Sequence, residues 1–133
     1  AILFGCAATA GLETLQMIRT IPDFYKILEE KTKRLLGGWL DAAAEAGVAV
    51  QVHQSGSMFC LFFNDKPVLN YEDSCACDGK KFKTWFLSML EQGIYLAPSP
   101  FETLFMSYAH SEDDLDRTIS AARIAMKEAA EAK

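Results

Sequence analysis

The stretch that decides the fold is Val48-Ala49-Val50-Gln51-Val52-His53, followed by Gln54-Ser55-Gly56-Ser57 and then Met58-Phe59-Cys60-Leu61-Phe62-Phe63. The valines recur at every second position, which is the spacing of residues on one face of a strand. The second run is continuously apolar, which is typical of a strand buried on both faces. Two such runs joined by a short polar turn with glycine predict an antiparallel hairpin.

Helical patterns flank this hairpin on both sides. Apolar residues recur at helical spacing in four segments, which are residues 7–19, 23–46, 79–92 and 111 onward. Ser111, with Asp114 three residues later, predicts a capped start for the last helix, and residues 127–133 are expected to fray. A third strand is predicted over Leu104–Ala109. The order predicts a single α+β domain over residues 1–133, with a three-stranded antiparallel sheet and helices packed on one face.

Two features in this pattern leave alternatives open. Gly37-Gly38 lies inside the long second helix, where glycine is unfavourable, so either a kink or a tight helix contact is expected. Residues 64–78 form a long polar connection without core periodicity. Loops of this length are uncommon unless they are functional or mobile, so a flap over a site or a surface for a partner domain is expected.

Composition excludes several classes of protein. The chain has 133 residues and a formal net charge of −5, without a lysine and arginine cluster, which argues against nucleic-acid binding. The longest apolar stretch is far too short to cross a bilayer, and no signal peptide is recognised. Cys60 is expected to be a buried thiol, and Cys75 and Cys77 lack further metal ligands at a recognisable spacing. The cysteine usage favours a reducing, cytosol-like compartment.

The segment Tyr95-Leu96-Ala97-Pro98-Ser99-Pro100-Phe101-Glu102 stands out as a candidate site. Its two prolines fix φ and remove backbone donors, so a stiff non-helical loop is expected to present the carboxylate of Glu102 beside the third strand. A charge beside a core is costly unless it is solvated or paired. Glu102 is therefore either a rim residue that points at water or a functional carboxylate.

The residues contain no recognisable catalytic constellation of their own. No glycine-rich phosphate loop is present, because Gly37-Gly38 is not followed by Lys-Ser or Lys-Thr. Serine-nucleophile motifs are also absent, and no lysine has an obviously apolar setting. His53 is expected on an exposed strand face and His110 beside a helix cap.

Three stretches together resemble the C-terminal part of glutamate-1-semialdehyde 2,1-aminomutases. These are Gly47–Val52 leading into Gly56-Ser57-Met58-Phe59-x-Leu61-Phe62-Phe63, then Gly93-Ile94-Tyr95-Leu96-Ala97-Pro98-Ser99-x-Phe101-Glu102, and then Ala109–Thr118. Asp65-x-Pro67-Val68 and Asn70-Tyr71 are also similar. The resemblance extends from about Ala10 to Arg123.

The resemblance implies a pyridoxal-phosphate (PLP) dependent isomerase of fold type I. Its members move an amino group between neighbouring carbons of glutamate-1-semialdehyde, and the product, 5-aminolevulinate, feeds tetrapyrrole synthesis. They are homodimers in which the small C-terminal domain packs on the PLP domain and closes one wall of the substrate site. The family's glutamate in the Phe-Glu element matches Glu102, where it would repel the extra carboxylate of ordinary transaminase substrates. A cytoplasmic location is implied, or a plastid in a plant or alga.

This chain departs from the family pattern in ways that limit its own chemistry. No segment matches the region of the PLP-binding lysine, the expected Gly-Asn-Pro element is absent, and Pro100 stands where relatives often have Gln. We therefore expect neither PLP binding nor catalysis by this chain alone. Either it is the substrate-site domain of an aminomutase whose PLP domain is its partner, or it is a stand-alone α+β binding module. The docking surfaces should be unusually apolar in the first case and polar in the second.

Overall fold

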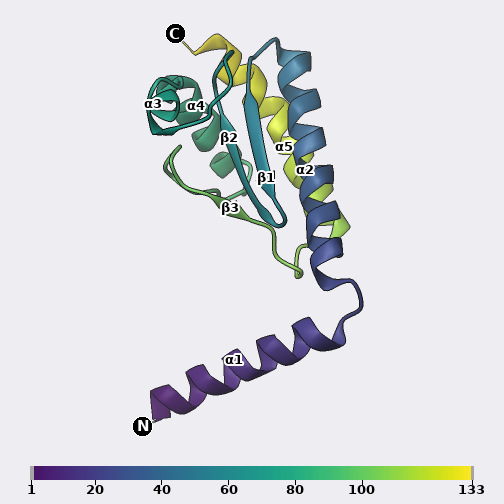
Figure 1. The fold of residues 1–133 in the computed structure, drawn as a ribbon. Coiled ribbons are helices and arrows are strands. Elements are labelled where there is room, and N and C mark those ends of the chain that lie inside the picture. Colours follow the sequence, from purple (N-terminus) through teal and green to yellow (C-terminus); the bar gives the residue numbers. More distant parts are fainter. Residues whose placement is uncertain (1, 133) are drawn as a thin grey trace.

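Three antiparallel strands form a sheet in the order β1 (Gln51–Ser55), β2 (Met58–Phe62), β3 (Leu104–Phe105). The computed structural model describes residues 2–132, with the side chains of residues 5–132. Helices α2 (Phe24–Ala46), α4 (Gly79–Glu91) and α5 (Glu112–Glu131) pack together behind the sheet (Figure 1). The predicted α+β class, with its antiparallel sheet and packed helices, is confirmed.

The hairpin has the predicted direction but a different burial pattern. Successive side chains of β2 point to opposite faces of the sheet. Phe59 and Leu61 face the core, whereas Met58 is exposed and Cys60 is half-buried. The prediction that this strand is buried on both faces is wrong, because the helices cover one face of the sheet only. For the same reason Cys60 is not a buried thiol, since it lies on the other face, cross-strand from the exposed His53.

The core lies between the sheet and the three packed helices. Trp39 of α2 and Trp85 of α4 meet edge to face, with ring centroids 5.2 Å apart. Met89 and Met126 are fully buried beside them. Residues from three different helices therefore fill one centre, which is why the helical periodicity read from the sequence identifies core residues.

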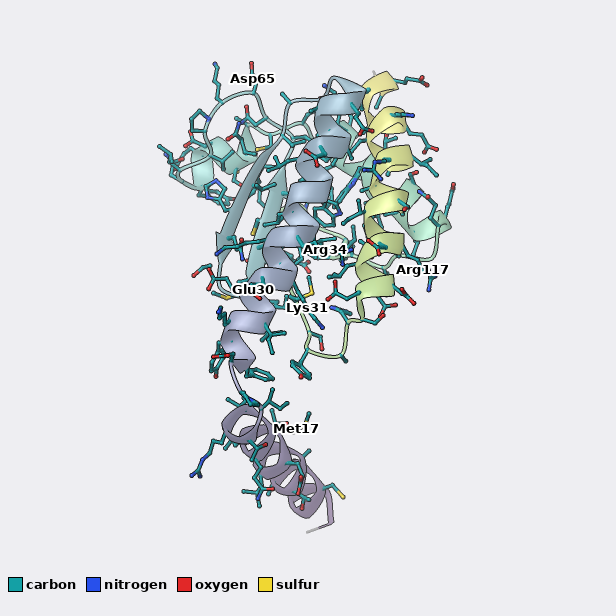
Figure 2. All side chains as sticks on the ribbon, turned by 90° about the vertical axis from the view of Figure 1, so that its right-hand side faces the viewer. Met17, Glu30, Lys31, Arg34, Asp65 and Arg117 are labelled. Atoms are coloured by element: carbon teal, nitrogen blue, oxygen red, sulfur yellow. The ribbon has the colours of Figure 1, made fainter. Side chains whose placement is uncertain are left out.

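The start of α5 is held against α2 by charged side chains. Arg34 is ion-paired with Glu112 and Asp116, and the ammonium group of Lys31 donates to the backbone carbonyls of Tyr108 and His110. Figure 2 shows Lys31 and Arg34 on the part of α2 that lies beside α5 and the segment leading into it. These contacts fix the segment that connects β3 to α5.

The helix ends follow the sequence closely. Gly47 ends α2 in the left-handed conformation (φ 70°), as glycine at this position commonly does. Ser111 and Asp114 form the predicted capping box at the start of α5. The expectation that residues 127–133 fray is wrong over most of that segment, because the helix continues to Glu131 and Ala129 is fully buried against the core.

Two irregular segments differ from their predictions. The third strand is much shorter than predicted, because only Leu104–Phe105 pair with β2 before the chain turns towards α5. The long polar connection contains a short helix, α3 (Tyr71–Cys75), capped by the side chain of Asn70. The capping residue explains this helix locally, since an asparagine side chain satisfies an amide that a helix leaves unpaired.

Helix α1 (Ile2–Thr20) stands apart from the rest of the fold. It points away from the sheet and the packed helices (Figure 1). Its side chains from residue 5 to residue 20 are exposed, with the exception of the half-buried Ile18. Asp23, in the junction between α1 and α2, has a positive φ of 53°.

Candidate functional site

The loop that carries Glu102 ends in a tight turn. Gly93 takes a positive φ of 81° after α4, and the chain then runs without regular structure to Ser99. The Glu102 amide donates to the carbonyl of Ser99 at 3.2 Å, which closes a four-residue turn with Pro100 in its second position. Proline is favoured there because its fixed φ suits that position. Pro100 therefore fits this loop well.

This loop rests directly on the core. The cavity between the loop residues Ala97 and Pro100 and the core side chains Leu61 and Trp85 is only about 10 Å³, so it has room for no more than about one water molecule. The serine hydroxyl adds a further constraint, because Ser99 Oγ accepts a hydrogen bond from the Phe101 amide at 3.3 Å. The loop is non-helical, as predicted, and it packs on the core. Its stiffness stays a prediction.

The structure places Glu102 in solvent. Its side chain is exposed, beside Phe101, which is 57% exposed. Within residues 2–132 its carboxylate forms no ion pair and accepts no hydrogen bond. This position suits both roles that the sequence left open, a solvated rim residue and a carboxylate that another domain covers.

The long connection reaches this loop through α3. The ring of Tyr71 lies 6.1 Å from that of Phe101, centroid to centroid. A hydrogen bond with the thiol of Cys75, and that thiol's charge, raise the pKa of Tyr71 above its usual value. A cavity of about 170 Å³ between α3, α4 and the loop is lined in part by Cys75, Cys77 and Phe101. The contact between Tyr71 and Phe101 had no clear signal in the sequence, because Tyr71 lies in a short helix that helix propensity alone does not predict.

Neither histidine belongs to a catalytic or metal-binding cluster. His53 is exposed and meets the ring of Phe62 edge to face, and His110 Nδ1 accepts from the amide of Ser107. Within residues 2–132 no three His, Cys, Asp or Glu side chains gather as metal ligands would, so Cys75 and Cys77 form no recognisable metal site. In the same part of the chain no helix has the length and apolarity needed to span a membrane.

The uncovered face of the sheet is apolar next to the Glu102 loop. Met58 and Phe105 are cross-strand partners and are 42% and 64% exposed. Cys60 Sγ lies 3.5 Å from Thr103 Oγ1, at the edge of a shallow hollow of about 330 Å³. Tyr95, 74% exposed, lies at the other end of the loop. Tyr95 and Phe101 belong to the loop that carries Glu102, Phe105 lies in the strand after it, and Met58 is the cross-strand partner of Phe105. We call these four exposed residues the apolar rim.

Comparison of the sequence with known proteins finds relatives that share one enzyme name. The chain is 47% identical over 116 residues to a glutamate-1-semialdehyde 2,1-aminomutase of Citrifermentans bemidjiense, which covers 87% of this chain and 27% of the relative. Aminomutases of Desulfosudis oleivorans and Geotalea daltonii match at 45% and 47% identity, over 88% and 87% of this chain. The chain thus spans about a quarter of the length of these relatives. No family model matches the chain.

Solved structures with the same fold are PLP enzymes and transaminases. The Sphingopyxis FumI protein, solved in its PLP internal aldimine form, matches with a TM-score of 0.70 at 25% identity, over 88% of this chain and 25% of its own. The β-phenylalanine aminotransferase of Variovorax paradoxus matches with a TM-score of 0.62 at 28% identity, over 71% and 22% of the two chains. An ω-transaminase of Sphaerobacter thermophilus, at 20% identity and a TM-score of 0.68 over 85% and 26% of the two chains, shares the fold.

The predicted resemblance is confirmed by these matches, since they cover most of the chain and carry one enzyme name. The solved structures share the fold over 71–88% of this chain. Over most of its length the chain is similar to the C-terminal part of glutamate-1-semialdehyde 2,1-aminomutases.

Proposed function

We propose that this chain is the domain that closes one wall of the substrate site in a PLP-dependent glutamate-1-semialdehyde 2,1-aminomutase. The enzyme would move the amino group to the neighbouring carbon and release 5-aminolevulinate. The observation that carries the proposal is the apolar rim around Glu102. The relatives' name, at 47% identity over most of this chain, supports the reaction.

The rim distinguishes the two hypotheses that the sequence left open. Tyr95, Phe101 and Phe105 are each more than half exposed within one loop and the short strand after it. Aromatic side chains gathered at one place on a surface mark an interaction site more often than isolated ones do. A stand-alone module would have replaced them with polar residues. The rim therefore favours a domain whose loop is covered by the rest of a longer enzyme.

Glu102 is the residue that we propose for substrate discrimination. The turn at Ser99 holds its backbone, whereas its carboxylate is left without a cation among residues 2–132. Once a second domain excludes water from the loop, that carboxylate would disfavour any ligand that places another carboxylate nearby. Substrates of ordinary transaminases with an extra carboxylate would then be rejected.

The residues described here do not fit a PLP site by themselves. Lys31 and Lys81 are the half-buried lysines, and both are engaged, Lys31 with backbone carbonyls and Lys81 with Asp78. The other lysines between residues 2 and 132 are exposed. An imine-forming lysine is activated by an apolar setting, and none of these positions provides one. We propose that the cofactor and its lysine belong to the rest of the enzyme, which forms a cytoplasmic homodimer.

Substrate specificity of the full-length enzyme tests the role of Glu102. We expect Glu102→Gln to raise kcat/KM for transamination of a substrate with an extra carboxylate by about tenfold or more, because a repulsion of roughly 1.4 kcal/mol or more is removed. Two variants serve as controls: Glu102→Asp, which keeps the charge, and Glu128→Gln, on the exposed side of α5. Both should leave the ratio of transaminase to aminomutase activity near its original value. Unchanged discrimination in Glu102→Gln would show that Glu102 is a rim residue.

A further inference from the structure

We propose that α1 is a docking helix that packs, through the face bearing Ala8, Leu12, Leu15 and Ile18, into the part of the enzyme that precedes it in the chain. This rests on the proposal that the chain belongs to a longer enzyme. The boundary of the C-terminal domain would then lie at residues 21–23, so the expected single domain over residues 1–133 would begin with α2 instead.

Helix α1 has the composition of a buried helix and the surroundings of an exposed one. Among its 19 residues only Glu13 and Arg19 are charged. Yet Leu12 is 56% exposed and Leu15 is 61% exposed. A largely apolar helix that buries none of its faces has only marginal stability in water, because most helix stability in proteins comes from burying an apolar face.

Four apolar residues of α1 share one face, because positions 8, 12, 15 and 18 follow the i, i+3 and i+4 spacing that aligns side chains along a helix. Arg19, four residues after Leu15, stands at the C-terminal end of this face, and Gln16, four residues after Leu12, borders it. Glu13 and Met17, which is 50% exposed, lie on the opposite side. Gly11 lies beside Leu12 and Leu15 on the apolar face, and no atom would approach a Cβ added there within 4 Å in this structure. The described residues of this face are therefore exposed, except for the half-buried Ile18.

The threonines of α1 are already satisfied within the helix. The hydroxyls of Thr9, Thr14 and Thr20 each donate to the backbone carbonyl four residues earlier, at 2.8–2.9 Å. A hydroxyl that is bonded inside its own helix can leave water without the cost of an unsatisfied donor. The three threonine side chains therefore allow α1 to enter a dry interface.

The preceding part of the enzyme is the occupant that the chain length favours. The aminomutase relatives are almost four times as long as their matched region, and that region is their C-terminal part. A partner joined directly to the start of α1 acts at a high effective concentration, which a second copy in solution does not reach. The junction at residues 21–23, with Asp23 in the left-handed conformation, separates α1 from the body of the domain.

Two matched lysine substitutions test this docking. Leu15→Lys and Met17→Lys add the same charge two positions apart, on opposite sides of a helix for which leucine, methionine and lysine have similar propensities. In the full-length enzyme we expect Leu15→Lys to lower the thermal midpoint by several degrees and Met17→Lys to leave it within about one degree. In the 133-residue chain both should leave the midpoint unchanged, because both side chains are exposed there.

Hydrogen exchange of the unsubstituted proteins gives a second readout, which does not depend on a variant folding. The amides of residues 12–18 should exchange at least about a hundredfold more slowly in the full-length enzyme than in the 133-residue chain. Equal exchange rates, or equal effects of the two lysine substitutions, would overturn the proposal. So would a native source protein whose intact mass corresponds to 133 residues.

A second copy of this chain is the competing occupant, and sedimentation distinguishes it. If the 133-residue chain forms a dimer that Leu15→Lys abolishes, while the full-length enzyme tolerates the substitution, α1 docks between copies and the proposal is wrong. These readouts measure stability and association. They are therefore independent of the specificity test at Glu102, and either proposal can fail while the other holds.

Discussion

A Cβ atom added to Gly38 of α2 would lie 2.6 Å from Cγ1 of Ile119 on α5, and 2.7 Å from its Cδ1 and Cγ2. The two helices therefore approach each other at a point where only glycine fits. Of the two explanations for Gly37-Gly38, the tight helix contact is correct, and α2 is continuous through both residues. Gly37 is different, since no atom lies within 4 Å of its added Cβ.

The two glycines should therefore respond in opposite ways to alanine. Gly37→Ala should stabilise the 133-residue chain by about 0.5–1 kcal/mol, because alanine loses less backbone entropy in a helix. Gly38→Ala should destabilise it by about 1–2 kcal/mol, because overpacking against a β-branched side chain outweighs that gain. Urea unfolding at a single pH measures both. If Gly38→Ala is also stabilising, Ile119 moves aside and the contact is not tight.

The capping box of α5 predicts a pH dependence of stability. Hydrogen bonds from the Ser111 hydroxyl and the Ser111 amide hold the pKa of Asp114 below its usual 3.8. A carboxyl whose pKa is lower in the folded state contributes stability above its unfolded pKa, and this contribution is lost as the pH falls through the folded pKa. Asp114→Asn should therefore flatten the pH dependence of unfolding below about pH 4.

Asp113→Asn is the control for this experiment, because Asp113 lies in the same first turn without bonding to Ser111. Ser111→Ala should weaken the folded state by about 1 kcal/mol at neutral pH, which is typical for loss of an N-cap hydroxyl. Thermal unfolding of the three variants between about pH 2 and pH 7 measures both effects. An Asp114→Asn profile that coincides with that of Asp113→Asn would argue against a special role for the box.

Side chains of β2 and β3 point to either the covered or the uncovered face of the sheet. Truncating a phenylalanine on each face should therefore cost very different free energies of unfolding. Phe59 is 5% exposed and faces the core, whereas Phe105 is 64% exposed on the uncovered face. Phe59→Ala should cost about 3–5 kcal/mol of unfolding free energy. Phe105→Ala should cost less than about 1 kcal/mol and should reduce self-association of the chain, since it removes part of the apolar rim. Similar losses of stability in both variants would contradict the burial pattern.

Absorbance spectra test the expectation that this chain has no activity of its own. Exposed lysines can form weak adducts with added PLP, so a band alone decides nothing. We expect no PLP-dependent band that shifts when glutamate-1-semialdehyde is added to the 133-residue chain. The full-length enzyme serves as the positive control. A substrate-dependent shift with the short chain would show that the residues described here hold the cofactor.

The predictions from sequence that succeeded depend on local chemistry. The alternating valines and the turn at Gly56 predicted the hairpin, although β1 begins only at Gln51 and contains one of the three valines. Ser111 and Asp114 predicted the capped start of the last helix, which the structure shows at Ser111. Each of these signals depends on interactions between residues a few positions apart. The turn before Glu102 is local in the same way, since it is formed by Ser99 and Pro100.

The sequence alone determined the four long helices, the hairpin, the family resemblance and the candidate glutamate, because propensity, capping and motif similarity are properties of neighbouring residues. The tertiary structure alone decided which face of β2 is covered, that Gly38 meets Ile119, that Tyr71 reaches Phe101, and that the described side chains of α1 are exposed apart from the half-buried Ile18. Burial depends on contacts between residues distant in sequence, and periodicity cannot show whether a partner surface exists. Met58 and Phe105 illustrate this, since their apolar side chains favour burial while their own domain leaves them exposed.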